Sequence, residues 1–532
     1  MQGSADPSGG ASVKHSFQAL SPARFLSRAA AVYGDRVAVV DGRDRFTYAD
    51  LYRRARQLAG ALIGLDLRPG DRVAVLSANR HEVLEAHYGV PFADGVLVTV
   101  NSRLGAAEIA HILRHSGAGI LICSPSLGQL AEKAAAESRR DITVVHIGDE
   151  YERLLEQATL YEAVVSDELA AVAVNYTSGT TGAPKGVIYS HRGAYLQALA
   201  MAFHAGLTAD STYLWTLPMF HCNGWCFTWA VTAAAGTHVC LETVGKDAVW
   251  SEIEAHDVTH LCAAPTVLSM IAPGDEDPDH GHGRSIWVGV GGAPPAPAVL
   301  ARARARGLRV THLYGMTETY GPVVINEWQS RWDELPEEQR DRLAARQGVG
   351  NIVSEPVRVV NEAGIDIPAD AVTLGEIALR GNNITPGYLN DSAATESAVP
   401  DGWLRTGDLA VRHPDGYIEI RDRAKDVIIS GGENLTSVEI EQALLAHPAV
   451  AEAAVVARPD EQWGERPVAF IEPVGQTPVT ADELRTHLLE RIARFKVPDA
   501  FEFGRLPRTA TGKVQKFALK QRLHAPHGGR PA

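Results

Sequence analysis

The sequence contains few cysteines and no long apolar run. Its 532 residues include five cysteines at uneven spacing, which excludes the disulfide framework of small secreted proteins and suits a reducing cytoplasm. His221, Cys222 and Cys226 lie close together, but their spacing matches no common zinc site and no second cluster supplies the remaining ligands. No apolar run reaches the about 18 residues that a membrane-spanning helix requires. We therefore expect a cytoplasmic protein without a membrane span.

The sequence also lacks an excess of positive charge. It has 50 Lys and Arg residues against 64 Asp and Glu residues, for a net charge of −14, which argues against nucleic acid as a partner. Phosphate ligands are not excluded, because backbone amides and a few basic side chains can bind them in an acidic protein. The composition is that of a globular protein, and the length predicts at least two domains.

Patterning changes along the chain. Residues 1–16 are rich in glycine and serine and lack an apolar core, so they predict a disordered leader rather than an export signal. Between residues 17 and 424, short apolar runs alternate with helical stretches. This alternation predicts a large N-terminal α/β domain of parallel sheets covered by helices. Shorter, punctuated strands over 357–420 predict a small antiparallel or barrel-like subdomain.

A different pattern begins at Lys425, and residues 425–532 are enough for a small α+β C-terminal domain. There we expect strands over 426–430, 450–457 and 468–471 and helices over 437–446 and 481–494. In the larger domain we expect strands over 72–76, 96–100, 118–122 and 142–145 and helices over 48–65 and 107–115.

The strongest motif is YTSGTTGAPKG at residues 176–186. Glycines permit a backbone whose N–H groups point at one anion, and the hydroxyl groups and the lysine add donors. The segment is not a Walker A loop, because no Gly-Lys-Ser/Thr closes it. A flexible linker seldom lies between two strand-like runs, so we expect a polyphosphate-binding loop. Its candidate ligands are Thr177, Ser178, Gly179, Thr180, Thr181, Gly182 and Lys185.

This loop resembles the signature loop of the adenylate-forming superfamily, which includes acyl-CoA synthetases, luciferases and peptide-synthetase adenylation domains. The other motifs of the superfamily follow in order, so the resemblance spans nearly the whole chain. PMFHCNGWCFTW at residues 218–229 is most similar to the short- and medium-chain fatty acyl-CoA synthetases. The resemblance implies an ATP-dependent acid–thiol ligase. It would form an acyl-adenylate with ATP and Mg²⁺, then transfer the acyl group to coenzyme A.

YGMTET at residues 314–319 resembles the second motif of the superfamily. The resemblance implies that Tyr314 lies against adenine, that Thr317 binds the α-phosphate and that Glu318 is a catalytic residue that holds Mg²⁺. The residue types suit these roles, because tyrosine offers a flat face and a carboxylate is a hard oxygen ligand.

WLRTGD at residues 403–408 resembles the ribose-binding motif. The resemblance implies that Asp408 accepts from both ribose hydroxyls, with Arg423 in support. PRTATGK at residues 507–513 resembles the C-terminal motif, whose lysine, Lys513, would neutralise the α-phosphate and the substrate carboxylate. Lys185 is the second catalytic cation, since two anionic reactants must be brought together.

The resemblance also implies a mobile C-terminal domain. Lys425 occupies the hinge position of the superfamily, and a hinge needs only a few residues that absorb a large φ/ψ change. Rotation would replace Lys513 at the site with the segment that contains Gly431 and Gly432. These glycines would let the backbone approach the pantetheine arm of coenzyme A closely.

The predicted acyl pocket uses His221, Trp225, Gly291, Gly292 and Ala293. The resemblance implies that His221, at the position of a gating histidine, is also one of the catalytic residues. Ligand pockets are mostly apolar with a few polar guides, and this mixture fits that pattern. Taken alone, His221 is also typical of a packed core histidine. In several members of the superfamily a hydroxyl residue precedes the Gly-Gly-Ala segment, whereas this chain has valine there. The acid stays open between an aliphatic and a bulky cyclic one.

Three alternatives stay open on the sequence. In the first, the acyl group goes to the thiol of a carrier protein instead of coenzyme A. In the second, the chain retains only thioester formation from a supplied acyl-adenylate. In the third, it binds nucleotides without ligase turnover. The joint presence of Lys185, Glu318, Asp408, Arg423 and Lys513 argues against the last. A homodimer is compatible with the sequence but not indicated by it.

Overall fold

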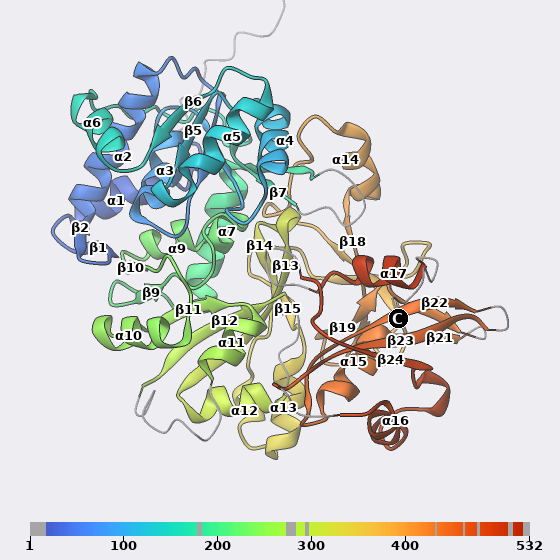
Figure 1. The fold of residues 1–532 in the computed structure, drawn as a ribbon. Coiled ribbons are helices and arrows are strands. Elements are labelled where there is room, and N and C mark those ends of the chain that lie inside the picture. The colour runs from blue at the N-terminus through green and yellow to red at the C-terminus, as the bar shows by residue number, and fades with distance from the viewer. Residues whose placement is uncertain are drawn as a thin grey trace, which may run out of the picture.

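A computed structural model describes residues 17–177, 184–272, 284–292, 297–430, 433–460, 463–475, 479–508 and 514–524. The predicted leader over 1–16 lies outside these ranges. The N-terminal part of the chain forms alternating layers of helices and two large sheets, and the C-terminal part lies beside them (Figure 1).

The first large sheet contains the apolar runs that the sequence predicted as parallel strands. Its six strands have the order β6-β5-β3-β4-β7-β8, parallel except for β8 at one edge. Helices pack on both faces, which is why these strands are continuous runs of Val, Ile and Leu. The bounds are β3 (Arg72–Leu76), β4 (Val96–Thr99), β5 (Ile120–Cys123), β6 (Thr143–His146), β7 (Ala171–Tyr176) and β8 (Gly186–Ser190).

The second large sheet has nine strands in the order β15-β14-β13-β12-β11-β9-β10-β1-β2. In this spatial order the six strands from β13 to β1 are parallel to one another. The strands β2, β14 and β15 pair antiparallel at the two edges. The bounds are β1 (Val37–Asp41), β2 (Asp44–Thr47), β9 (Thr212–Leu214), β10 (Thr237–Cys240), β11 (His260–Ala263), β12 (Ile286–Gly291), β13 (Leu308–Met316), β14 (Gly321–Ile325) and β15 (Val349–Gly350).

The helices form three layers around these two sheets. The outer face of the first sheet is covered by α4 (Ala106–Ser116) and α5 (Gly128–Ser138). The outer face of the second sheet is covered by α10 (Lys246–His256), α11 (Pro265–Ile271) and α12 (Pro297–Ala305), and α13 (Glu337–Ala345) packs beside α12. Between the sheets lie α1 (Arg24–Tyr33), α2 (Tyr48–Gly64), α3 (His81–Phe92), α6 (Asp149–Gln157), α7 (His191–Ala205) and α9 (Phe227–Ala233).

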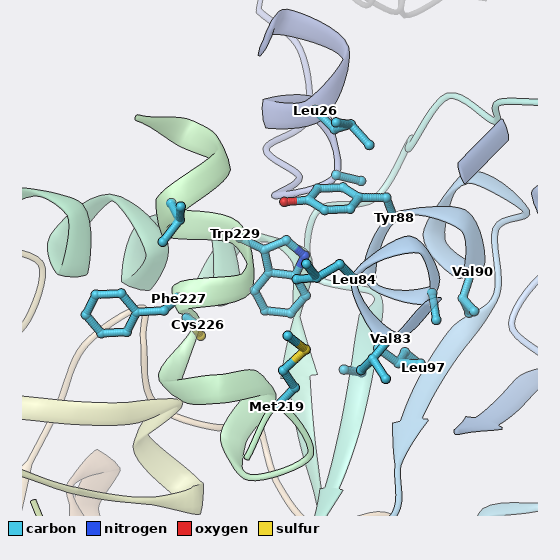
Figure 2. Close-up of a cluster of buried hydrophobic side chains, with 14 of the residues drawn as sticks. Leu26, Val83, Leu84, Tyr88, Val90, Leu97, Met219, Cys226, Phe227 and Trp229 are labelled. Carbon is cyan, nitrogen blue, oxygen red and sulfur yellow. The ribbon is translucent and has the colours of Figure 1, made fainter. Parts of the chain in front are cut away.

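The core between the sheets anchors the segment that contains the predicted acyl pocket. Figure 2 shows Trp229 of α9 beside Leu84 and Tyr88 of α3, with Met219 below it. The indole Nε1 of Trp229 donates to the His87 carbonyl at 3.3 Å, and the Tyr88 hydroxyl donates to a carbonyl of α9 at 2.8 Å. The residues just before α9 therefore rest on a close-packed core.

A four-stranded antiparallel sheet follows, where the sequence predicted an antiparallel or barrel-like subdomain. Its strands are, in spatial order, β16 (Arg358–Val360), β17 (Gly375–Leu379), β18 (Leu404–Arg412) and β19 (Ile418–Arg423), and α14 (Ser392–Ala398) lies before β18. The register of β18 and β19 pairs Asp408 with Arg423. Two residues of the predicted ribose motif are thereby brought side by side.

The last sheet contains only strands that follow residue 425. Its elements are β20 (Ile428–Ser430), β21 (Glu433–Leu435), α15 (Ser437–Leu445), β22 (Val450–Asp460), β23 (Gly464–Pro473), α16 (Ala481–Leu489), β24 (Ala500–Phe503) and α17 (Lys516–His524). The strand order is β21-β20-β23-β22, with β24 on β23.

The helix predicted over 481–494 is too long by several residues. It ends at Leu489, and the N–H groups of Arg491 and Ile492 both donate to the Leu488 carbonyl, which closes the last turn. The chain then enters a 3₁₀ turn, and an ion pair of Lys496 with Glu439 at 2.7 Å joins this turn to α15. Within the described ranges, none of the helices combines the length and apolar character that crossing a bilayer takes.

Candidate active site

The predicted nucleotide residues Tyr314, Asp408 and Arg423 form one cluster. The Tyr314 hydroxyl donates to Asp408 Oδ2 at 2.7 Å, and Arg423 Nε lies 3.0 Å from Asp408 Oδ1. Burial and the neighbouring Asp408 charge raise the pKa of Tyr314 well above its usual value, so it stays a donor. The structure thus orients one buried carboxylate from both sides, as a ligand with paired hydroxyls requires.

The predicted phosphate loop joins two paired strands. β7 leads into it and β8 leads out of it, and the two strands are hydrogen-bonded antiparallel. At its base the Thr177 N–H donates to the Lys185 carbonyl at 3.0 Å. Lys185 is exposed, and its Nζ lies 4.9 Å from the centre of the Tyr388 ring. The other predicted ligands, Ser178, Gly179, Thr180, Thr181 and Gly182, lie outside the described residues.

Glu318 lies in a 3₁₀ turn, Thr317–Thr319, that follows β13. Its side chain is buried, and its Oε1 accepts from the Tyr388 hydroxyl at 2.8 Å. Its backbone carbonyl accepts from the Thr385 N–H at 2.7 Å. Tyr388 was not predicted from the sequence. Its only local signal is an aromatic residue after a glycine in Pro386-Gly-Tyr, which by itself does not indicate a site.

Two buried tyrosines, which the sequence did not predict either, support the same turn: Tyr189 of β8 and Tyr320, which directly follows the turn. The Tyr189 hydroxyl donates to the Thr317 carbonyl at 2.8 Å, and the Tyr189 ring stacks on Tyr320 at a centroid distance of 3.9 Å. The Tyr320 hydroxyl accepts from the Ser190 N–H at 2.6 Å. Ser190 in turn caps α7, because its Oγ accepts from the Gly193 N–H at 3.1 Å.

The segment after His221 forms a short left-handed helical turn, labelled α8 (Cys222–Trp225). The φ angles of residues 222 to 226 are 51°, 51°, 60°, 55° and 62°. For non-glycine residues this conformation costs about 1–2 kcal/mol each, so tertiary contacts must hold it. Backbone bonds inside the turn run from the Trp225 N–H to the His221 carbonyl at 3.3 Å and from the Cys226 N–H to the Cys222 carbonyl at 3.2 Å.

Buried polar contacts fix this turn on α3 and α9. Asn223 is fully buried, and its side-chain amide lies 3.2 Å from Nε2 of His87, whose Nδ1 donates to the Val83 carbonyl at 2.7 Å. With Nδ1 protonated, Nε2 accepts, so the amide of Asn223 donates to it through its NH2 group. Burial lowers the pKa of His87 to about 4, so the imidazole is neutral near pH 7. The Thr228 hydroxyl donates to the Asn223 carbonyl at 3.1 Å.

The turn brings the predicted acyl-pocket residues together. Trp225 packs on two glycines, since a Cβ at Gly291 would lie 2.9 Å from the Trp225 ring and one at Gly321 would lie 3.0 Å from its Cα. Cys222 Sγ lies 3.8 Å from Thr317 Oγ1, which links the pocket to the nucleotide motif. His221 is half-buried at the start of the turn, Gly292 is exposed with φ of 102°, and Ala293 lies outside the described residues.

The predicted hinge residue Lys425 is exposed, and its backbone carbonyl accepts from Lys520 Nζ at 2.9 Å. Although the residue is exposed, partial desolvation of its amine and the neighbouring Arg423 charge lower the pKa of Lys425. Asp422, just before it, accepts from the Ser437 N–H at 2.5 Å and the Ser437 hydroxyl at 2.9 Å. Three further predicted residues, Gly431, Gly432 and Lys513, belong to segments that the structure does not describe.

These residues form two clusters that the segment from Tyr314 to Thr319 joins, and the turn at Trp225 lies beside that segment. A carboxylate held by Tyr314 and Arg423 lies in one cluster, and Lys185, Tyr388 and Glu318 lie in the other. The turn at Trp225 touches the same motif through Thr317. Such an arrangement suits a reaction in which negative charge must be cancelled next to an organic acid.

Family models match most of the chain. The model described as AMP-binding enzyme matches residues 26–389, and the one described as AMP-binding enzyme C-terminal domain matches residues 439–513. An acetate–CoA ligase from Humulus lupulus is 43% identical over 537 residues, which covers 95% of this chain and 94% of that protein. A peroxisomal trans-cinnamate:CoA ligase from Petunia hybrida is 39% identical over 533 residues, with 94% of each covered.

Solved structures with the same fold include the o-succinylbenzoate CoA synthetase of Bacillus subtilis. Its complex with the acyl-adenylate intermediate has a TM-score of 0.82 and 30% identity, and covers 95% of this chain and 99% of that one. Its complex with ATP and a magnesium ion has a TM-score of 0.81 and 29% identity. The match covers 94% of this chain and 99% of that one. The predicted α/β fold class is confirmed, and the chain belongs to the AMP-binding enzyme family, the adenylate-forming enzymes whose motifs its sequence resembles.

Proposed function

We propose that the chain is an AMP-forming acyl-CoA ligase. It activates a carboxylic acid with ATP to an acyl-adenylate and transfers the acyl group to the thiol of coenzyme A. The observation that carries this proposal is the convergence of Tyr314, Asp408 and Arg423 with Glu318 and Lys185 beside the turn that carries Trp225. Relatives named as CoA ligases of acetate and of trans-cinnamate favour coenzyme A over a carrier-protein thiol.

The nucleotide residues each have a role in this reaction. Asp408 accepts from the ribose hydroxyls, with Arg423 beside it, and Tyr314 lies against adenine. Lys185 and the loop from Thr177 to Gly182 bind the phosphates through N–H and hydroxyl donors. Because both reactants are anionic, their positioning and the cancellation of charge account for most of the rate enhancement.

Glu318 fits the role of the magnesium ligand. Mg²⁺ prefers hard oxygen ligands and is often bound by one or two carboxylates together with substrate phosphates. The Glu318 carboxylate is buried, its Oε1 is oriented by a neutral hydroxyl, and Thr317 adds a second oxygen next to it. Bound there, Mg²⁺ would supply charge neutralisation to the phosphates.

The acyl pocket lies at Trp225, with His221, Gly292 and Ala293 at its margin. The Trp225 ring occupies the space over Gly291, and this packing favours a short aliphatic acid over a bulky cyclic one. The relatives act on acids of both sizes by name. A panel of acids from acetate to cinnamate, read as CoA thioesters by mass spectrometry, tests this order of preference.

Thioester formation requires a second arrangement of the chain. We assign residues 17–424 to the large domain, residues 425–532 to the small one and Lys425 to the hinge. Lys513 serves adenylation, and Gly431 and Gly432 come to the site for coenzyme A. The contact of α17 with the hinge supports this assignment, because α17 starts just after Lys513 and its Lys520 bonds the Lys425 carbonyl. A cytoplasmic location stays a prediction, since some relatives are named as peroxisomal.

The change Lys513→Ala tests the proposal. It removes a cation needed only while phosphate charge develops, so acid-dependent pyrophosphate exchange falls by about 10²–10³-fold. Thioester formation from synthetic acyl-AMP and coenzyme A is retained. Lys133→Ala on α5, an exposed lysine remote from the site, leaves both steps unchanged.

An equal loss of both half-reactions in Lys513→Ala contradicts the role of Lys513. If the wild-type protein with magnesium and the acid panel binds neither ATP nor an acyl-adenylate, the proposed function itself is wrong.

A further inference from the structure

Tyr388 joins the two oppositely charged groups that the proposed reaction uses. Its hydroxyl donates to Glu318 Oε1 at 2.8 Å. The face of the same ring lies 4.9 Å from Lys185 Nζ, within the range of a cation–π contact. One side chain thus contacts both the carboxylate that fits Mg²⁺ and the ammonium group of the phosphate loop.

The backbone around Tyr388 is tied to the segments that carry both partners. The Leu389 N–H donates to the Gly186 carbonyl at 2.7 Å, and the Ile188 N–H donates to the Gly387 carbonyl at 3.1 Å, so residues 387–389 lie along β8 next to Lys185. The Thr385 N–H donates to the Glu318 carbonyl at 2.7 Å. Tyr388 is therefore placed by local backbone bonds to both sides and not by its side-chain contacts alone.

A glycine makes this path possible. Gly387 has a φ of 151°, and a Cβ there would lie 2.7 Å from Cγ2 of Thr395. Thr395 also accepts the Tyr388 N–H on its Oγ1 at 2.9 Å. The start of α14 thus closes on the back of the segment and fixes the direction in which the tyrosine leaves the backbone.

The hydroxyl is a permanent donor to Glu318. A phenol ordinarily has a pKa of about 10, so at neutral pH the Tyr388 hydroxyl keeps its proton and donates a hydrogen bond to Glu318. A carboxylate as buried as Glu318 needs such a donor, because an unpaired buried charge is costly.

Tyr388 also contacts two groups of opposite charge at once. Lys185 and Glu318 both belong to the described part of the chain, and no ion pair joins them there; each instead contacts a different part of the tyrosine. A direct Lys185–Glu318 pair would neutralise the cation meant for phosphate and the anion meant for magnesium. A neutral tyrosine contacts both the Lys185 ammonium group and the Glu318 carboxylate, and it neutralises neither charge.

We infer that Tyr388 is a positioning residue for ATP activation, which orients Glu318 through its hydroxyl and Lys185 through its ring before the nucleotide binds. This inference rests on the proposed function. It assigns to Tyr388 no contact with a substrate, so its effect is confined to the step that needs Mg²⁺ and the phosphates.

Two substitutions separate the two contacts. Tyr388→Phe keeps the ring and removes the hydroxyl, so Glu318 loses its donor while Lys185 keeps its aromatic face. A hydrogen bond to a charged group corresponds to roughly a tenfold effect or more. We expect the Mg²⁺ concentration for half-maximal pyrophosphate exchange to rise roughly tenfold, with thioester formation from synthetic acyl-AMP unchanged. Tyr388→Leu removes both contacts and lowers exchange further.

Binding measured without turnover gives an independent readout. Calorimetric titration of ATP with Mg²⁺ and with EDTA shows how much the metal strengthens ATP binding. We expect Tyr388→Phe to reduce this strengthening roughly tenfold and to leave metal-free ATP binding unchanged. Tyr388→Leu weakens metal-free binding as well, because Lys185 is no longer held. In the background of Glu318→Gln, Tyr388→Phe adds no further loss, since it acts through Glu318.

Tyr52→Phe is the matched control. The Tyr52 hydroxyl donates a hydrogen bond to Glu162 in the helix layer away from the site. The variant Tyr52→Phe therefore loses a tyrosine–carboxylate bond of the same kind. It is expected to behave as wild type. If Tyr388→Phe is folded and shows wild-type Mg²⁺ dependence in both assays, or loses both half-reactions equally, the inference is overturned. Wild-type exchange activity in the same experiment keeps that outcome distinct from failure of the proposed function.

Discussion

Single buried side chains set much of the chemistry of this molecule. Asp408 is oriented from two sides, Glu318 from one, and both depend on a tyrosine hydroxyl that burial keeps protonated. The neutral tyrosine hydroxyl orients each carboxylate without removing its charge, and Asp408 has the Arg423 guanidinium beside it as well.

At the same scale, buried histidines predict an acid-sensitive fold. His238 is fully buried between Trp215 and Thr232, whose side chains lie 3.2 and 3.0 Å from its ring nitrogens. Burial, with His87 nearby, lowers the pKa of His238 to about 3. The unfolded chain binds a proton near pH 6.5 that the folded chain does not. Stability is therefore complete above pH 6.5 and falls as the pH drops from there toward 3, by about 1.4 kcal/mol per pH unit for this group.

His238→Gln removes that titration. Urea unfolding between pH 7.5 and 4.5 is expected to show a lower stability at pH 7.5 than wild type but a shallower loss with acid, by about one bound proton. An identical pH slope in wild type and variant means that His238 does not stay neutral in the folded protein.

At the scale of elements, the left-handed turn over residues 222–226 is the least ordinary feature. Gly224 lies at its centre, with φ of 60°, and a Cβ there would approach the Trp215 ring to 2.3 Å. The turn presents Trp225 to Gly291 and Gly321, so its shape decides how much room the acyl pocket has.

Gly224→Ala tests how tightly that turn is packed. The added methyl group must displace a fully buried indole, so we expect a loss of about 2–4 kcal/mol in unfolding free energy. Gly119→Ala is the control, because Gly119 is exposed and nothing lies within 4 Å of a Cβ there. Denaturant unfolding followed by tryptophan fluorescence measures both. A change of less than about 0.5 kcal/mol in Gly224→Ala would show that the turn relaxes freely.

At the scale of the whole molecule, hydrogen bonds between described residues cross the proposed domain boundary near Lys425. Across it, Asp422 of β19 accepts from Ser437 at the start of α15; within the small domain, Lys520 of α17 bonds the Lys425 carbonyl (Figure 1). These contacts lie close to the proposed hinge, where they can hold one arrangement of the two parts. Domain motion is the usual expectation for such a connection.

Lys425→Pro restricts the backbone at that point, because proline fixes φ near −65°. We expect it to impair one half-reaction far more than the other, as seen by comparing pyrophosphate exchange with thioester formation from acyl-AMP. Lys425→Ala, which keeps the backbone free, serves as the control. Unchanged overall turnover in the proline variant would place the hinge elsewhere.

The sequence was informative where a function depends on contiguous residues. The strands over 72–76 and 142–145 and the helix over 48–65 follow from local hydrophobic pattern, and the structure places them within a residue or two. The phosphate loop, YGMTET and the Asp408 motif were found because each chemistry needs several residue types in one short segment. The end of α16 was predicted wrongly, because backbone bonds from Arg491 and Ile492 to the Leu488 carbonyl close the last turn before the predicted end.

The sequence by itself determined the family, the layered α/β class and the residues whose motifs are local. Only the tertiary structure decided which of them meet. Tyr388, Tyr189, His87 and Asn223 carry no local signal, because their roles arise from contacts with segments far away in the chain. The left-handed turn was equally hidden, since its strained backbone is stable only when α3, α9 and Trp215 close around it. Neighbouring residues in a motif determine which chemical groups are present, whereas the packing of distant segments determines how those groups are oriented.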